Sequence, residues 1–163
     1  MRKQKEIMEH DDLYFMRQAI REGRKALETG DVPVGAVVVL NGKIIGRGHN
    51  QVELLKDPTA HAEMIAITAA TAFIGEKWLR EATLYVTVEP CAMCAGAAVL
   101  ARLKRVVYGV QEIKTGAHSS LFNLLNDPRL NHQIEVTPGV ARDECAALMM
   151  EFFKHLRENK QMD

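Results

Sequence analysis

The sequence lacks several features that mark secreted and membrane proteins. Its 163 residues include three cysteines, an odd and small number that argues against the disulfide framework of a small secreted domain. No apolar run is long enough to span a bilayer. No apolar segment follows the basic start at residues 1–5, which excludes the pattern of a secretory signal peptide. We therefore expect a cytoplasmic protein that does not enter a membrane.

An excess of charge of either sign is also missing. The formal net charge is zero, with 21 basic and 21 acidic residues, so a surface that binds nucleic acid must be a local patch. There is no internal repeat, low-complexity stretch or linker. Apolar residues make up 47% and charged residues 26%, as in ordinary globular proteins. This length and composition predict a single domain over residues 1–163, with one sizeable core.

The first part of the chain predicts a helix followed by a β-hairpin. Apolar residues from Leu13 to Leu27 recur at helical spacing, and the helix is expected to end near Gly30. Its possible N-terminal caps are Asp11 and Asp12. The apolar run 34–40 and the segment 43–48 flank Asn41-Gly42, which is a strong signal for a two-residue hairpin turn.

The rest of the chain alternates between helices and strands. The expected elements are a helix over 60–72 capped by Thr59, a strand over 82–88, a helix from Pro90 to about Leu103, a strand over 105–110, a polar loop over 111–118, a short helix over 121–125, a strand over 134–137 and a helix over 140–157. This order predicts an α/β fold with three layers, α/β/α, in which helices cover both faces of a mixed sheet of about five strands.

Two short motifs each open one of the predicted helices. They are His61-Ala62-Glu63 and Pro90-Cys91-Ala92-Met93-Cys94. The two cysteines are three residues apart, so their thiols lie on one face of a helix, and the partial positive charge of a helix N-terminus favours thiolates. His61 and Glu63 would diverge in the middle of a helix, but in a first turn both can reach a site beyond the helix end. The two helix starts are therefore expected to converge on one site.

One imidazole and two thiolates form a ligand set that suits zinc. Three protein ligands leave a fourth position for water, whose pKa zinc lowers to about 7. Cys145 is the obvious candidate for a fourth ligand, but it lies in an apolar helical repeat with Leu148 and Phe152 and is expected in the core. We therefore predict one catalytic zinc ion per chain.

The zinc ligands are predicted to be His61, Cys91 and Cys94, and Glu63 is placed to move protons between the water and a leaving amine. His61-x-Glu63 together with Pro90-Cys91-x-x-Cys94 resembles the signature of the cytidine deaminase superfamily. From about residue 12 to residue 158 the chain resembles the bacterial tRNA-specific adenosine deaminases. The segments that carry this resemblance are 32–37, 57–63, 83–91, 93–96, 114–117 and 143–148, with the pair Phe152-Phe153.

The resemblance implies hydrolytic deamination of adenosine to inosine at the wobble position of a tRNA anticodon stem-loop, by a homodimer. It also implies that Asn50 contacts the flipped base beside the metal. The loop 111–120, which includes Glu112 and Lys114, would line the RNA. This loop departs from the family pattern: Glu112 stands where the pattern has Asp, and His118-Ser119 replaces a small residue and a Gly.

Less specific explanations exist for several of these residues. A Cys-x-x-Cys motif alone also fits a structural zinc site or a redox pair. Asn50 can simply end a strand. The basic residues of the last helix form either a phosphate-binding patch or a solvated helix end. They are Lys154, Arg157 and Lys160, and three other basic residues, Lys104, Arg105 and Lys114, are expected near the mouth of the site.

Two other functions remain open at the level of sequence. A deaminase of free nucleobases or nucleosides would share the metal motif. A non-catalytic, zinc-stabilised RNA-binding module would need the metal ligands but not Glu63, so this residue argues against it.

Overall fold

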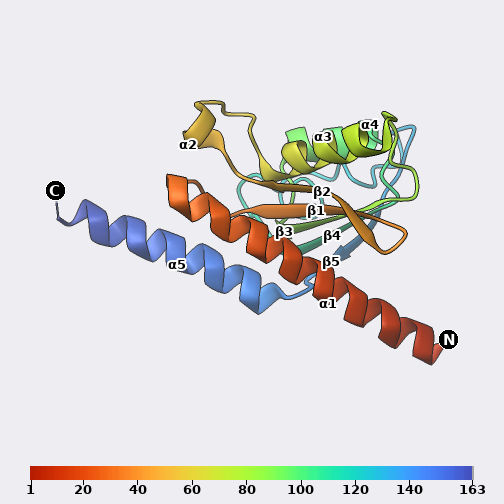
Figure 1. Cartoon of the computed structure of the whole chain (residues 1–163), viewed down its shortest axis with the longest axis horizontal. Helices are drawn as coiled ribbons and strands as arrows, with labels where there is room; N and C mark the ends of the chain where they lie inside the picture. The colour runs from red at the N-terminus through yellow and green to blue at the C-terminus, as the bar shows by residue number, and fades with distance from the viewer. Residues whose placement is uncertain (163) are drawn as a thin grey trace.

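Five strands form one mixed sheet, which is the middle layer of the computed structural model (Figure 1). The structure describes residues 1–162, apart from the side chain of Met8. The strands are β1 (Gly35–Leu40), β2 (Lys43–His49), β3 (Thr83–Val88), β4 (Arg105–Val110) and β5 (Glu135–Pro138), in the spatial order β2-β1-β3-β4-β5.

Helices cover both faces of this sheet. The long helices α1 (Arg2–Lys25) and α5 (Arg142–Lys160) lie on one face, and α3 (Ala62–Ile74) and α4 (Ala92–Leu100) lie on the other (Figure 1). A 3-10 turn, η1 (Ala26–Thr29), follows α1, and a one-turn helix, α2 (Val52–Leu55), precedes α3. The predicted fold class, α/β/α with a five-stranded mixed sheet, is confirmed. None of the helices in the described part of the chain is long and apolar enough to cross a membrane.

Strand pairing joins β1 and β2 into a hairpin and brings the C-terminal ends of β3 and β4 to the same end of the sheet. β1 pairs antiparallel with β2 through the turn at Asn41-Gly42, where both residues have positive φ, so the predicted hairpin is confirmed. β3 and β4 are parallel, with Val88 beside Val110. The segments that follow these two residues therefore start side by side, and one of them leads into α4.

Each helical layer packs on its own apolar core. Between the sheet and α3–α4, the buried residues are mainly alanine, valine and leucine, and Leu84, Val86 and Tyr108 contribute from the strands. Between the sheet and α1–α5, Cys145 is fully buried with Met16 and Val107, which confirms its predicted place in the core.

Two glycines of β2 let α3 approach the sheet very closely. A Cβ on Gly48 would lie 2.3 Å from the carbonyl oxygen of Ala62, and a Cβ on Gly46 would lie equally close to that of Ala66. Distances this short are not compatible with any side chain, so both positions need glycine. The contact at Gly48 fixes the first turn of α3, which carries His61 and Glu63.

The N-terminal helix is longer than predicted. α1 begins at Arg2, and Asp12 is not a cap. Instead the buried Asp12 carboxylate accepts hydrogen bonds from the guanidinium of Arg105, at 2.7 and 2.8 Å, and from the hydroxyl of Tyr85, at 2.8 Å. Asp12 thus joins α1 to β3 and β4, a long-range role that its position in the sequence does not reveal.

The predicted helix over 121–125 is wrong. This segment is irregular, and its backbone amides instead bond back to the preceding loop, as from Leu124 to the carbonyl of Ala117. Other boundaries shift by a few residues: α3 starts at Ala62 rather than at Ala60, and α4 ends at Leu100 rather than at Leu103. α3 starts late because His61, and not Thr59, occupies the cap position.

Candidate metal centre and active site

The two sequence motifs lie at the N-termini of α3 and α4. His61 and Cys91 are the N-cap residues of these helices, and both have extended backbone conformations with ψ of 150° and 175°. Glu63 is then the second residue of α3, and Cys94 is the third residue of α4. As the spacing predicted, both helix starts point into one site.

The three predicted ligand atoms have the separations that a tetrahedral metal site requires. The Nδ1 atom of His61 lies 3.6 Å from the Sγ atoms of both Cys91 and Cys94. For Zn–S bonds of about 2.3 Å and Zn–N bonds of about 2.0–2.1 Å, a tetrahedral angle gives an N···S separation of about 3.6 Å. The three atoms together lie within 4.8 Å of one another. The donor set and its geometry therefore fit a zinc ion with one open position.

The two thiols are electrostatically coupled. The hydrogen bond with Cys94 lowers the pKa of Cys91 to about 4, and contact with His61 acts in the same direction against the effect of burial. Contact with Cys91 raises the pKa of the Cys94 thiol, as does burial. Of the two thiols, Cys91 therefore gives up its proton more easily.

Glu63 is a buried acid in the wall of the same cavity. Its side chain is 3% exposed, and burial raises the pKa of its carboxyl group. The nearby imidazole of His61 lowers this pKa, but the effect of burial outweighs it. A raised pKa brings the carboxyl group closer to the range in which it can both accept and release a proton, as a general acid/base must.

A small cavity of about 110 Å³ connects these groups, and it adjoins a larger groove of about 750 Å³. The cavity is lined by Val32, Val34, Asn50, His61, Glu63, Val88, Glu89, Cys91, Glu112, Thr115 and Met149. Val32, Asn50, His61 and Thr115 line the groove as well, with α2 and the aromatic pair Phe152-Phe153 of α5. The groove has the size of typical ligand pockets, about 300–1,000 Å³, and leads to the metal ligands.

Asn50 lies between the cavity and the start of α3. Its Oδ1 atom accepts a hydrogen bond of 2.9 Å from the backbone amide of Ala62, so it satisfies an N–H group that His61 leaves uncapped. The structure thus gives Asn50 a positioning contact and a place in the cavity wall. Its predicted contact with a base stays a prediction.

The loop 111–120 borders the cavity through two of its residues, and its predicted contact with RNA stays a prediction. Glu112 and Thr115 line the cavity, whereas Lys114 is exposed and is not among the lining residues; its backbone amide bonds to the carboxylate of Glu112 at 3.1 Å. The two departures from the family pattern, His118 and Ser119, both contact the hydroxyl of Tyr108, at 2.9 and 3.3 Å. These two contacts attach the loop to β4, which contains Tyr108.

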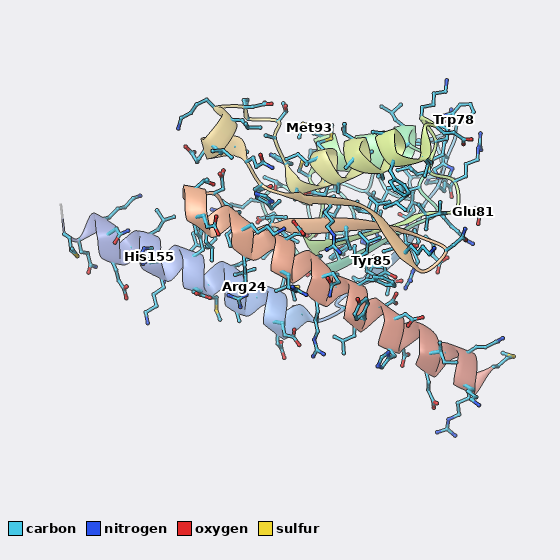
Figure 2. All side chains as sticks on the ribbon, in the orientation of Figure 1. Arg24, Trp78, Glu81, Tyr85, Met93 and His155 are labelled. Atoms are coloured by element: carbon cyan, nitrogen blue, oxygen red, sulfur yellow. The ribbon has the colours of Figure 1, made fainter. Side chains whose placement is uncertain are left out.

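The prediction that Lys104 and Arg105 lie near the mouth of the site is wrong. Lys104 directly precedes β4 and Arg105 is its first residue, whereas the cavity is at the other end of the sheet, beside Val88 at the end of β3. Lys104 pairs with Glu81 at 3.2 Å, and Figure 2 shows Glu81 at the end of the molecule away from Met93, which is in the first turn of α4. Arg105 is engaged by Asp12.

Sequence reasoning missed one buried acid at the site, Glu89. It follows the last residue of β3 and is 3% exposed. The available signal in the sequence is the charge of Glu89. An acidic residue between an apolar strand and the Pro90-Cys91 turn is rarely buried unless its carboxylate is paired or hydrogen-bonded.

Comparison with known proteins agrees with this geometry. A family model described as MafB19-like deaminase matches residues 9–157. The chain is 49% identical over 154 residues to the tRNA-specific adenosine deaminase of Bacillus subtilis, covering 94% of this chain and 95% of the relative. It is 48% identical to the tRNA-specific adenosine deaminase of Aquifex aeolicus, covering 90% and 96%.

The chain belongs to the tRNA-specific adenosine deaminase family. A solved structure from a study of A-to-I editing by tRNA:A34 deaminases at the wobble position superposes with a TM-score of 0.79 at 43% identity, covering 83% of this chain and 98% of that one. The guanine deaminase of Nitrosomonas europaea superposes with a TM-score of 0.75 at 25% identity, covering 86% and 83%. The fold is thus shared by deaminases of different substrates.

Proposed function

We propose that this protein is a zinc-dependent deaminase that converts adenosine to inosine at the wobble position of tRNA anticodons. The single observation that carries the chemistry is the buried Glu63 beside a three-ligand metal group in one cavity. A structural zinc site does not require an adjacent buried carboxyl group. This observation is therefore also evidence against a non-catalytic binding module.

The metal ligands are His61, Cys91 and Cys94, with one ion per chain. Zinc bound by three such ligands supplies a polarised water at its open position, with a pKa lowered to about 7. Glu63 accepts a proton from the attacking water and delivers it to the amine that leaves. Adenosine and water thereby give inosine and ammonia, and Glu63 ends the reaction in its starting protonation state.

The remaining residues of the cavity hold the base. The Oδ1 atom of Asn50 already accepts a hydrogen bond from the amide of Ala62. The amide nitrogen of its side chain is therefore the group that can donate to a ring acceptor of adenine. Glu112 lines the cavity and can accept a hydrogen bond from the nucleotide. Lys114 is exposed on the same loop and is placed for a phosphate outside the cavity.

Several features of the groove favour RNA over a free nucleoside. The groove extends well beyond the small cavity and is lined by Phe152 and Phe153, whose rings can stack against unpaired bases. Lys154, Arg157 and Lys160 are exposed on the same helix, on the part that projects from the sheet, where Figure 2 labels His155. The target adenosine must leave its stack to reach Glu63, which an anticodon loop permits easily. The relatives with the same motifs are named tRNA-specific adenosine deaminases.

A second copy of the chain is proposed to cover the outer face of α3 and α4. α4 carries no charged residue, and the only charged residue of α3 is the buried Glu63. Phe73 and Leu100 are nevertheless 72% and 78% exposed on these helices. An exposed surface with this composition is typical of a protein interface.

The substrate class is tested by comparing deamination of three kinds of compound. They are a stem-loop with adenosine at the wobble position, the same stem-loop with guanosine there, and free adenosine, cytidine and guanine. We expect rapid release of ammonia from the first only. Efficient turnover of a free compound with the stem-loop inert would contradict the tRNA assignment and leave the zinc chemistry intact.

Salt provides an independent discrimination between the two substrate classes. If the cations of α5 and Lys114 neutralise phosphates, log affinity for the stem-loop should fall with log salt, with a slope of about −0.7 for each phosphate contact. Binding of a free nucleoside would depend little on salt.

A further inference from the structure

Glu89 is a buried acid that the chemistry of the site does not use. It lies between β3 and the Pro90-Cys91 turn, and its own amide continues the strand pairing by donating to the carbonyl of Val110 at 2.8 Å. Its side chain lines the cavity but is directed into the loop 112–120, as its hydrogen bonds show.

A single carboxylate binds both ends of this loop. Its Oε2 atom accepts hydrogen bonds from the backbone amides of His118, Ser119 and Ser120 at 2.9, 3.1 and 3.3 Å. Its Oε1 atom accepts one from the amide of Glu112 at 3.2 Å and one from the hydroxyl of Ser120. All five partners are donors, and this is the arrangement that a carboxylate satisfies, because both of its oxygen atoms are acceptors.

The loop also closes directly on the metal-binding turn. The amide of Ala117 donates to the carbonyl of Pro90 at 2.8 Å, and Gly116 forms a β-bridge with Cys91. Gly116 packs on the Glu89 carboxylate so tightly that a Cβ there would lie 2.4 Å from Oε2. The segment between the two anchored ends contains Thr115, which lines the cavity and the groove, and the exposed Lys114.

We propose that Glu89 is a positioning residue for RNA binding, which holds the loop 112–120 against the metal-binding turn in the conformation that receives the anticodon. This inference rests on the proposed function. Glu89 acts through the loop and not on the reacting atoms, so its loss should weaken binding of the stem-loop while the zinc ion and the chemical step persist.

The test is the variant Glu89→Gln in the full-length protein. Glutamine keeps the shape but turns one acceptor into a donor that faces other donors. We expect the stem-loop concentration for half-maximal single-turnover rate to rise at least about tenfold, the scale of lost hydrogen bonds to a charged group. Zinc content should be unchanged, and the plateau rate should stay within about threefold of the original.

A matched control is Asp12→Asn, which alters another buried acid at the opposite end of the sheet. It should lower thermal stability without changing the half-maximal concentration, when measured well below both melting temperatures. Equal half-maximal concentrations for Glu89→Gln, Asp12→Asn and the unaltered protein would overturn the inference. So would loss of zinc, or a fall in the plateau rate alone, in Glu89→Gln.

Two further measurements keep the inference testable if Glu89→Gln folds poorly or the substrate assignment fails. Ser120→Ala removes one donor and keeps the carboxylate, and should raise the half-maximal concentration at least about threefold. Amide hydrogen exchange needs no substrate: the amides of residues 112 and 118–120 should exchange at least about tenfold faster in Glu89→Gln, with those of β3 unchanged. An unaltered protein inert on the stem-loop would refute the proposed function, whereas unchanged exchange would refute the role of Glu89.

Discussion

At the scale of single residues, metal binding and proton transfer are proposed to belong to different side chains. In the proposed site, His61, Cys91 and Cys94 would supply the metal-binding atoms from two helix starts, and Glu63 would supply none of them. Cys145 is on the other side of the sheet, where burial raises the pKa of its thiol to about 12. The three cysteines of the chain should therefore respond very differently to substitution.

We expect Cys91→Ala and Cys94→Ala each to lose zinc, and Cys145→Ala to keep about one zinc ion per chain. Removal of a thiolate leaves two protein ligands, too few for a stable site, whereas Cys145 contributes only apolar contacts. Metal analysis of the purified proteins measures this directly. Loss of zinc from Cys145→Ala would indicate a fourth protein ligand and a structural site.

Glu63→Ala should retain zinc, fold and stem-loop binding but lose turnover by roughly two to four orders of magnitude, because the variant has no group to transfer the proton. Single-turnover kinetics at saturating stem-loop separates this loss from weaker binding. A near-native rate would remove Glu63 from the mechanism. The exposed Glu53, in the wall of the groove, is a matched control whose change to Ala should leave the chemical step intact.

The sequence predicts the residues of the site better than their contacts. The spacing of His61 and Glu63, and of Cys91 and Cys94, is a local property, because each pair lies within one helical turn. The structure places His61, Glu63 and Cys91 in the wall of one cavity, and the Sγ atom of the buried Cys94 lies 3.6 Å from Nδ1 of His61. Glu89 could not be assigned from spacing, since its partners lie 23 to 31 residues away. The misplaced Arg105 has the same cause: its partner Asp12 is 93 residues away.

At the scale of elements, the position of α3 depends on the two glycines of β2. Gly48 contacts the first turn of α3, beside the metal ligands, and Gly46 contacts the helix one turn further along. A methyl group at either position must push the helix away from the sheet, which typically costs about 1–3 kcal/mol of stability. The effect on the metal site should differ between them.

We expect Gly48→Ala to lower both the melting temperature and the zinc affinity, because it displaces Ala62 and with it His61. Gly46→Ala should lower the melting temperature by a similar amount and leave the zinc affinity nearly unchanged. Competition with a zinc-binding dye compares the two. Equal zinc affinities would show that the metal site does not depend on how α3 packs against β2.

Elements with a clear apolar period are predicted well, and those fixed by distant contacts are not. The hairpin at Asn41-Gly42 and the strand over 105–110 are present as predicted. Residues 2–7 and 9–11 of α1 are exposed, and the start of this helix has no apolar stripe, so nothing in the sequence marks it as helical. The apolar segment 121–125 predicts a helix, but the amides of Leu121, Phe122 and Leu124 instead donate to carbonyl groups of the preceding loop.

At the scale of the whole molecule, zero net charge makes the distribution of charge decisive. The uncharged face of α3–α4 and the cationic end of α5 are on opposite faces of the sheet (Figure 1). A dimer formed through the first surface would leave the second free for RNA.

Leu100→Glu should therefore convert the protein from a dimer into a monomer, because it places two unpaired carboxylates in an apolar interface, which we expect to weaken association by at least about 100-fold. Met150 is another exposed apolar residue, on α5, and Met150→Glu should leave the dimer intact. Sedimentation equilibrium of both variants measures this. A Leu100→Glu protein that sediments as a dimer would place the interface elsewhere.

The central claim, that the cavity at the starts of α3 and α4 edits a wobble adenosine, is tested most directly by mapping inosine in total tRNA. The tRNA comes from cells that lack this activity and is incubated with the zinc-loaded protein or with Glu63→Ala. The account predicts inosine at the wobble position of one or a few tRNAs with the unaltered protein, and none with Glu63→Ala. The absence of inosine, or its appearance at positions unrelated to the anticodon, would contradict it.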